Sequence, residues 1–183
     1  MSKTTDLSQF QNSWYNPGSR FKRSAWFFVN AILLQNPVIP FSAVKVFWLR
    51  TFGAKIGKNV VVKPNVNIKY PWNLEVGENT WIGEKTWIDN LGKVTIGKNC
   101  CLSQGSFLLC GNHDYKKVSF DLMVKEITLE DGVWIGAKAV VCPGVICKSH
   151  AVLSVGSVAT SDLESYSIYQ GNPAVKIKER VID

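Results

Sequence analysis

The hydrophobic residues of the chain recur at every sixth position, which is neither the period of a helix nor that of a long strand. The recurrence is clearest in three blocks that start at Ile56, Val76 and Ile96, each 20 residues after the one before. In these blocks the aliphatic positions are Ile56, Val62, Ile68, Leu74, Val76, Ile82, Ile88, Val94, Ile96, Leu102 and Leu108. After an interruption the period returns at Leu129, Ile135, Val141, Cys147 and Leu153. Helices repeat at about 3.6 residues and strands at about 2, so this spacing predicts short strands joined by tight turns.

The residues around each aliphatic position indicate how the short strands are arranged. The next position is often glycine or acidic, as at Gly57 and Glu130, and the position four after the aliphatic is small or β-branched, as at Thr80 and Ala139. Three such strands close one triangular coil, with the aliphatic side chain inside and the small residue at the corner, and the coils stack in parallel. A sandwich would show sustained polar–apolar alternation, which is lacking. The sequence therefore predicts an all-β solenoid over residues 53–163.

The segment before the repeats predicts helices. Residues 14–52 are rich in aromatic and apolar side chains and are broken by Pro37 and Pro40, as in two short helices that follow a flexible terminus, residues 1–13. One interpretation is that the helices cap the solenoid, whose open end would otherwise expose strand edges and core side chains. The other is that residues 20–50 rest on a membrane surface, because basic residues lie beside aromatic ones. These residues are Arg20, Lys22, Arg23, Trp26, Phe27 and Phe28.

Composition narrows the function classes without changing this fold. Hydrophobic residues make up 46% of the 183 residues and charged residues 19%, which is the balance of one folded domain. The net charge of +7 is mostly scattered, so it favours an anionic ligand or membrane surface over nucleic acid. The first residues lack the layout of a secretory signal, and no apolar run approaches the roughly 20 residues that span a bilayer. We therefore expect a cytoplasmic location, in solution or at the inner face of the membrane.

The cysteine and histidine content argues against a disulfide framework and a metal centre. The five cysteines form no C-x-x-C pair, and their odd number does not suggest a set of disulfides. Cys147 and His150 have a spacing found in metal sites, but no second pair completes such a site. The two histidines of the chain are also too few for a three-histidine zinc site of the γ-carbonic anhydrase type. We therefore expect no metal cofactor.

The strongest chemical candidate lies where the repeat is interrupted. Between Leu108 and Ile127 the six-residue period stops, and residues 109–126 have the composition of a loop. A loop that interrupts a regular solenoid is a typical place for function, and this one contains His113. Histidine has an ordinary pKa near neutrality, so a neutral imidazole can accept a proton from an alcohol. His113 is therefore the candidate general base, with a solvated loop residue as the alternative, whereas His150 lies at a turn within a coil and is expected to be structural.

Three further polar residues have two open interpretations each. Asp89 and Asn90 precede His113 by about one coil, so they either bind hydroxyl groups of an acceptor or occupy a coil corner as turn residues. Asp114 follows the histidine directly and either orients the imidazole or bonds the backbone of its own turn.

The repeat, the histidine-bearing excursion, the motif VWIGAKAVVCPGV and the terminal motif GNPAVKIKER resemble the hexapeptide-repeat acyltransferases over residues 56–180. The stretches RFKRSAWFFVNAILL and GNHDY are similar to the colanic acid biosynthesis acetyltransferase branch, with nodulation and galactoside acetyltransferases as cousins. The resemblance implies a left-handed parallel β-helix with a short N-terminal helical segment and a protruding catalytic loop. It also implies a homotrimer with active sites between adjacent subunits, and a tail, residues 164–183, that completes an acetyl-CoA site.

The resemblance also implies roles for individual residues. The catalytic histidine of these enzymes aligns with His113, although several cousins place proline where this chain has Asp114. The residues aligned with the acetyl-CoA channel are Trp134, Ala137, Val155, Gly156, Thr160, Ser161 and Lys178. Val155 and Ser161 depart from the common residues, a small side chain and a lysine.

The function expected from these features is O-acetyl transfer. Acetyl-CoA donates the acetyl group, a hydroxyl of a sugar or exopolysaccharide precursor attacks the thioester directly, and His113 removes the hydroxyl proton. Two alternatives stay open. One is an acetyltransferase for a different acceptor, such as an antibiotic or an amino sugar. The other is a non-catalytic scaffold of a polysaccharide-synthesis assembly, against which the GNHDY loop argues.

Overall fold

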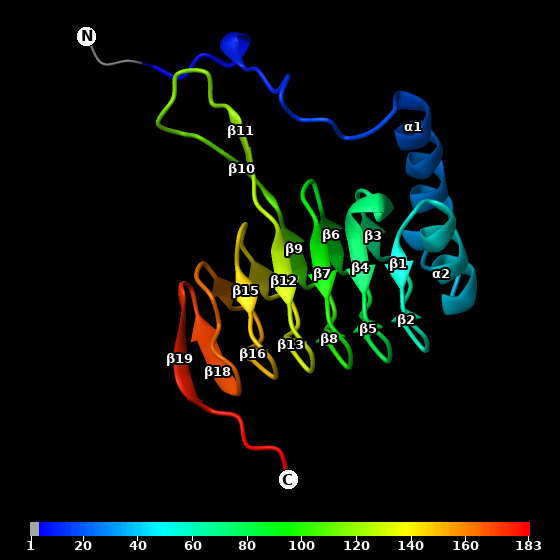
Figure 1. The fold of residues 1–183 in the computed structure, drawn as a ribbon, viewed down its shortest axis with the longest axis vertical. Coiled ribbons are helices and arrows are strands. Elements are labelled where there is room, and N and C mark those ends of the chain that lie inside the picture. Colours follow the sequence, from blue (N-terminus) through cyan, green and yellow to red (C-terminus); the bar gives the residue numbers. More distant parts are fainter. Residues whose placement is uncertain (1–3) are drawn as a thin grey trace.

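The computed structural model describes residues 4–183 and contains a triangular parallel β-helix whose three sides are parallel sheets (Figure 1). The first sheet contains β1 (Lys55–Ile56), β4 (Leu74–Val76), β7 (Val94–Ile96), β12 (Ile127–Leu129) and β15 (Ile146–Cys147). The second contains β2 (Val61–Val62), β5 (Trp81–Ile82), β8 (Cys101–Leu102), β13 (Trp134–Ile135), β16 (Val152–Leu153), β18 (Ser167–Gly171) and β19 (Ala174–Glu179). The third contains β3 (Asn67–Ile68), β6 (Trp87–Asp89), β9 (Phe107–Leu109), β14 (Val140–Val141) and β17 (Val158–Ala159). The predicted solenoid of stacked coils is confirmed.

The aliphatic positions of the repeat form the core, as the sequence predicts. Ile82, Leu102 and Ile135 are directly paired across the second sheet, and each is fully buried. Thr80 and Ala139, four residues after an aliphatic position, are buried at the corners. The repeat therefore places one column of side chains above another inside the triangle, where apolar burial stabilises every coil.

Glycine and asparagine have separate roles at the turns. Gly77 lies where two coils approach closely, and a Cβ atom there would lie 2.5 Å from the carbonyl carbon of Gly97. The left-handed backbone conformation occurs instead at Asn59, Asn79 and Asn99, whose φ angles are 56°, 58° and 55°. Asparagine tolerates this conformation better than most residues. The recurring glycine is therefore required for the spacing between coils, and the asparagine for the turn itself.

The N-terminal helices cover the open end of the solenoid. They are α1 (Arg20–Val29), the π-helical η2 (Asn30–Leu34) and α2 (Ser42–Thr51), and in Figure 1 they lie beside β1 and β2. Trp26, Leu34 and Leu49 are buried, and the Trp26 Nε1 atom donates to the carbonyl oxygen of Ile68 at 2.8 Å. The buried Lys45 ammonium donates to the carbonyl of Lys63 at 2.8 Å. The helices therefore satisfy edge carbonyl groups and cover core side chains, which is the geometry of a cap.

The excursion between β9 and β12 is a hairpin. β10 (Gly111–His113) pairs antiparallel with β11 (Leu122–Val124), within the stretch that the sequence predicts only as a loop. The N-terminal segment lies along this hairpin and contains the short helix η1 (Leu7–Gln9). The backbone N–H of Asp6 donates to the carbonyl of Val118 at 2.8 Å. Residues 1–3 of the predicted flexible terminus lie outside the described residues.

Two smaller features complete the chain. A short helix η3 (Pro71–Asn73) precedes β4, and β19 folds back antiparallel on β18 at the C-terminal end of the second sheet. Within residues 4–183, no helix has both the length and the apolar character that a membrane span requires.

Candidate active site

His113 lies at the end of β10, is half-buried and has two aromatic rings beside it. Its imidazole stacks on the ring of Phe120, with centroids 4.4 Å apart and an interplanar angle of 7°. The ring of Phe10, from the N-terminal segment, lies with its centroid 5.8 Å from that of the imidazole. Neither phenylalanine stands out in the sequence as a partner of the histidine, because both pairings depend on the shape of the hairpin.

One hydrogen bond determines which imidazole nitrogen is free. The Nδ1 atom of His113 lies 3.0 Å from the carbonyl oxygen of Phe120. A carbonyl oxygen can only accept, so Nδ1 carries the hydrogen and donates it. In the neutral ring the lone pair is then on Nε2, which is the nitrogen able to accept a proton. Phe120 itself has a φ of 51°, so the carbonyl is presented by a backbone conformation that costs energy in a bulky residue.

Asp114 bonds its own turn. Its Oδ1 atom accepts from the backbone N–H of Lys116 at 3.1 Å, and its backbone N–H donates to the carbonyl of Asp121 at 2.8 Å. The position next to Nδ1, where an orienting carboxylate would be placed, is taken by the Phe120 carbonyl. Of the two interpretations left open for Asp114, the geometry favours the turn residue.

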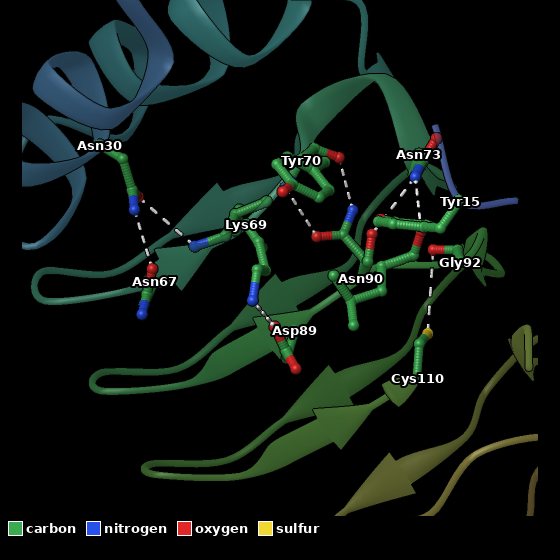
Figure 2. Close-up of polar contacts among 12 residues, drawn as sticks. Tyr15, Asn30, Asn67, Lys69, Tyr70, Asn73, Asp89, Asn90, Gly92 and Cys110 are labelled. Carbon is green, nitrogen blue, oxygen red and sulfur yellow. Dashed lines mark hydrogen bonds and ion pairs between the residues drawn. The ribbon is translucent and has the colours of Figure 1, made fainter. Parts of the chain in front are cut away.

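Asp89 and Asn90 lie at the end of β6, beside Lys69 and Tyr70 of the previous coil (Figure 2). The Asn90 amide accepts from the Tyr70 N–H at 2.9 Å and donates to the Tyr70 carbonyl at 2.6 Å, so it joins this corner to the previous coil. The Asp89 carboxylate is largely buried and forms an ion pair with Lys69, with Nζ and Oδ1 3.1 Å apart. Asp89 also lies opposite Leu109, two residues before the hairpin begins. The geometry thus favours a corner role for Asn90 and places the Asp89 carboxylate at the base of the hairpin, with Oδ2 3.9 Å from where a Cβ atom on Gly111 would lie.

A second site is a groove of about 720 Å³ over the second sheet. Four of the residues aligned with an acetyl-CoA channel line this groove, namely Trp134, Ala137, Val155 and Lys178. Gly156 follows directly, and its N–H donates to the Ala137 carbonyl at 2.9 Å. Thr160 and Ser161 lie beyond β17, past the end of the third sheet, and are exposed at that corner. The structure therefore brings Trp134, Ala137, Val155 and Lys178 together in one groove. Thr160 and Ser161 are not among the residues that line it.

The groove contains polar residues that the sequence reasoning missed. The Trp134 Nε1 atom donates to the Ser103 hydroxyl at 2.9 Å, which holds the indole in one orientation. Arg180 lines the groove beside Lys178, and its guanidinium donates to the carbonyls of Gly132 and His150 at 2.9 and 3.1 Å. The signal available in the sequence is that Ser103 stands where the two neighbouring coils of the same sheet have glycine, at Gly83 and Gly136.

His113 and the groove lie on different sides of the triangle. The hairpin leaves the chain between β9 of the third sheet and β12 of the first sheet, whereas the groove lies over the second sheet. In Figure 1 the hairpin projects from the top of the coils, and β13 and β16 lie at the bottom. One copy of the chain therefore does not bring His113 and Trp134 into one site.

The described part of the chain offers no arrangement for a metal ion. Residues 4–183 contain no group of three or more His, Cys, Asp or Glu residues placed to hold one. Cys147 and His150, whose spacing is found in metal sites, occupy different environments: Cys147 is buried in the core, and the His150 ring stacks on Tyr166 with centroids 4.7 Å apart. His150 has a φ of 60° and occupies a coil turn.

Comparison with known proteins identifies the family. No family model matches the chain. The chain is 36% identical over 178 residues to the protein named "Putative colanic acid biosynthesis acetyltransferase WcaF" of Escherichia coli (strain K12), covering 96% of this chain and 97% of that protein. An acetyl-CoA complex of a hexapeptide-repeat acetyltransferase from Vibrio cholerae O1 biovar eltor has a TM-score of 0.80 at 20% identity and covers 91% of this chain and 93% of that one. A galactoside acetyltransferase in complex with coenzyme A has a TM-score of 0.71 at 25% identity, and the match covers 87% of this chain and 80% of that one.

The similarity to WcaF extends over almost the whole of both chains, helical cap and hairpin included. The structural similarity confirms the predicted left-handed parallel β-helix, and the relatives confirm the predicted class of enzyme, an acetyltransferase. The chain therefore belongs to the hexapeptide-repeat acetyltransferases, in the same family as WcaF.

Proposed function

We propose that this acetyltransferase moves an acetyl group from acetyl-CoA to a hydroxyl of a sugar, with His113 as the general base. The observation that carries the proposal is the hydrogen bond from His113 Nδ1 to the Phe120 carbonyl, because it leaves the Nε2 lone pair free to accept a proton. The hairpin holds this base outside the regular coils, where an acceptor can reach it.

The reaction proceeds by direct attack. His113 Nε2 takes the hydroxyl proton as the acceptor oxygen bonds to the thioester carbonyl carbon. The bond between that carbon and the sulfur then breaks, the CoA thiolate leaves, and the imidazolium returns the proton to it. The carbonyl of Phe120 also suits the charged intermediate, because it accepts the Nδ1–H bond in both protonation states of the ring.

Direct attack needs no acyl-cysteine, and the three buried cysteines are poor nucleophiles. Burial raises the pKa of the Cys100 thiol to about 11 and that of the Cys110 thiol to about 12. Burial also raises the pKa of Cys147, which lies in the core. Thiols with such pKa values contain little of the nucleophilic thiolate at neutral pH.

Acetyl-CoA is assigned to the groove over the second sheet. Trp134 provides an aromatic wall, and Lys178 and Arg180 provide positive charge near the phosphate-bearing part of the cofactor. The ligands in the structures of the Vibrio cholerae enzyme and of the galactoside acetyltransferase, acetyl-CoA and coenzyme A, support this donor. Gly156, Thr160 and Ser161 are assigned to the same cofactor by the aligned pattern alone.

The functional unit is proposed to be a homotrimer. His113 and the groove lie on different sides of one chain, so a complete site requires the hairpin of one subunit and the groove of the next. Sedimentation equilibrium of the purified chain tests this directly, since a monomeric mass under assay conditions contradicts the shared site.

The acceptor is proposed to be a sugar or an exopolysaccharide precursor. The names of WcaF and of the galactoside acetyltransferase support a carbohydrate. Asp89 is the residue proposed to contact an acceptor hydroxyl, since its carboxylate lies at the base of the hairpin. The cytoplasmic location expected from the sequence stays a prediction.

The test is release of CoA thiol from acetyl-CoA with a panel of sugars, nucleotide-linked sugars, amino sugars and antibiotics. We expect turnover with a hydroxyl sugar and a loss of about a hundred- to ten-thousand-fold in the variant His113→Ala. His150→Asn is the matched control, because it removes the other imidazole and keeps a residue that tolerates the left-handed turn. Equal rates for His113→Ala and the native protein contradict the proposed base, and turnover with amino or antibiotic acceptors alone contradicts the proposed acceptor.

A further inference from the structure

The helices that cap the solenoid have a second, outward-facing surface that is apolar. Eight large hydrophobic side chains project from it into solvent, and we call this set the cap face: Phe21, Phe27, Phe28, Ile32, Val38, Phe41, Val44 and Phe47. Phe21 and Val38 are 85% and 81% exposed. Single exposed apolar residues are ordinary, but this many on α1, η2, α2 and the connection before α2 indicate an interaction surface.

The cap face is distinct from the surface that packs on the solenoid. Trp26, Leu34 and Leu49 point inward and are buried against the first coil, so capping does not require the outward side chains. The helices lie across one end of the stack of coils (Figure 1). A flat partner approaching along the axis of the solenoid therefore meets the cap face directly.

The charge around the cap face is one-sided. From Leu7 to Leu74 the chain has nine basic residues and no acidic residue, whereas the remaining positions have 12 basic and 14 acidic residues. The nine are Arg20, Lys22, Arg23, Lys45, Arg50, Lys55, Lys58, Lys63 and Lys69. Lys45 is buried, and Lys55 and Lys69 form ion pairs with Glu75 and Asp89 on the coils. The cap helices themselves carry Arg20, Lys22, Arg23 and Arg50 and, within residues 20–51, no acidic residue, so the charge beside the cap face is positive.

Basic and aromatic side chains also meet within the cap face. Arg20 and Arg23 line a hollow of about 460 Å³ together with Phe27 and Phe28. The Arg23 Nε atom is enclosed and has no hydrogen-bond partner among residues 4–183. Guanidinium groups next to aromatic rings suit an interface that is anionic at the surface and apolar below it.

We propose that the cap face docks on an anionic lipid bilayer, with its aromatic side chains among the acyl chains and its arginines among the headgroup phosphates. The charge complementarity favours this partner over a second copy of the chain, because two cap faces would bring like charges together. Docking of this kind lays short amphipathic helices in the plane of the interface and needs no membrane-spanning segment. The inference is independent of the acetyl transfer proposed above.

The test is flotation of the full chain with vesicles. One set contains phosphatidylglycerol mixed with phosphatidylcholine, and the other contains phosphatidylcholine alone. We expect binding to the anionic vesicles, weakened by added salt, and little binding to the neutral ones. Phe21→Ser combined with Phe28→Ser should lower the partition coefficient by about tenfold, and Arg20→Gln by about fivefold.

Val181→Ser is the matched control, because Val181 is 82% exposed and lies far from the cap face in the sequence and at the other end of the chain. It should bind vesicles as the native protein does. CoA release with a water-soluble acceptor should be unchanged in the double phenylalanine variant, which shows that the variant is folded and separates this inference from the proposed reaction. The inference is overturned if native protein does not float with anionic vesicles or if the double variant floats equally well. It is also overturned if light scattering gives the double variant a smaller assembly mass than the native protein, because the cap face would then join copies of the chain.

Discussion

The stacked coils and the hairpin that interrupts them hold their side chains in different ways. In the coils, Leu102 is fully buried between Ile82 and Ile135, and the same arrangement recurs from coil to coil. In the hairpin, His113 is half-buried and held by one ring and one carbonyl of Phe120. Stability is therefore spread over many equivalent contacts, whereas the position of the base depends on a few contacts that occur once. Substitutions in the core of the coils should therefore lower the free energy of unfolding, whereas substitutions in the hairpin should change activity and leave that free energy almost unchanged.

The largest expected effect is on the stability of the coils. Leu102→Ala removes a fully buried side chain from the centre of the stack and should lower the free energy of unfolding by about 2–5 kcal/mol. The close packing of neighbouring coils limits how far the cavity can collapse. Denaturant unfolding, followed by circular dichroism, measures the loss.

The matched variant in the hairpin is Met123→Ala, since Met123 is 38% exposed and pairs with Asn112 on β10. Its free energy of unfolding should stay within about 0.5 kcal/mol of the native value. A loss as large as that of Leu102→Ala would show that the hairpin is part of the same cooperative core, and the contrast between the two regions would be wrong.

The second largest effect is expected on KM for acetyl-CoA, from the Trp134 side chain, which lies on a regular coil. Trp134→Ala removes the aromatic wall of the proposed acetyl-CoA groove and should raise KM for acetyl-CoA by about tenfold. Trp134 is 47% exposed, so the variant should remain as stable as the native protein. Steady-state kinetics with varied acetyl-CoA measures the change.

Trp81 provides the control on the same sheet. It lies two coils away on the same row of paired residues, through Cys101, and is 57% exposed. Trp81→Ala should leave KM for acetyl-CoA unchanged. If both variants raise KM alike, the groove extends further along the second sheet than the lining residues indicate.

The scaffold could be predicted because the repeat encodes each coil several times. The aliphatic positions and the solenoid they form follow from spacing alone, and the helices before it follow from an aromatic, apolar composition broken by prolines. The handedness follows only from the family, since parallel crossovers are normally right-handed. Trp134 and Val155 share one groove because they belong to successive coils on one side of the triangle, whereas Lys178 reaches the groove from β19, which folds back antiparallel on β18. The direction in which a side chain faces can thus be predicted wherever the six-residue period continues.

The environment of the base could not be predicted in the same way. The pairing of β10 with β11 and the contact of Phe10 with His113 join segments that have no repeat to set their register. The partner of Nδ1 is a backbone carbonyl, and every residue has one, so no residue type points to it. The neighbouring carboxylate of Asp114 is the more visible candidate in the sequence, yet it bonds the turn.

The smallest expected effect tests which side chain supports His113, the stacked ring of Phe120 or the carboxylate of Asp114. Phe120→Ala removes the stacked ring but keeps the backbone carbonyl, so the base loses only its packing, worth about 1 kcal/mol. The value of kcat should fall about fivefold, with the free energy of unfolding unchanged, and Phe120→Tyr should restore it because the ring is retained. Asp114→Asn removes the carboxylate charge and keeps an acceptor for the turn, so kcat should stay near the native value. Steady-state kinetics on the three variants decides between the two groups: a fall in Asp114→Asn with no change in Phe120→Ala assigns the orientation of the imidazole to the carboxylate, and the hairpin would then hold its base by charge rather than by packing.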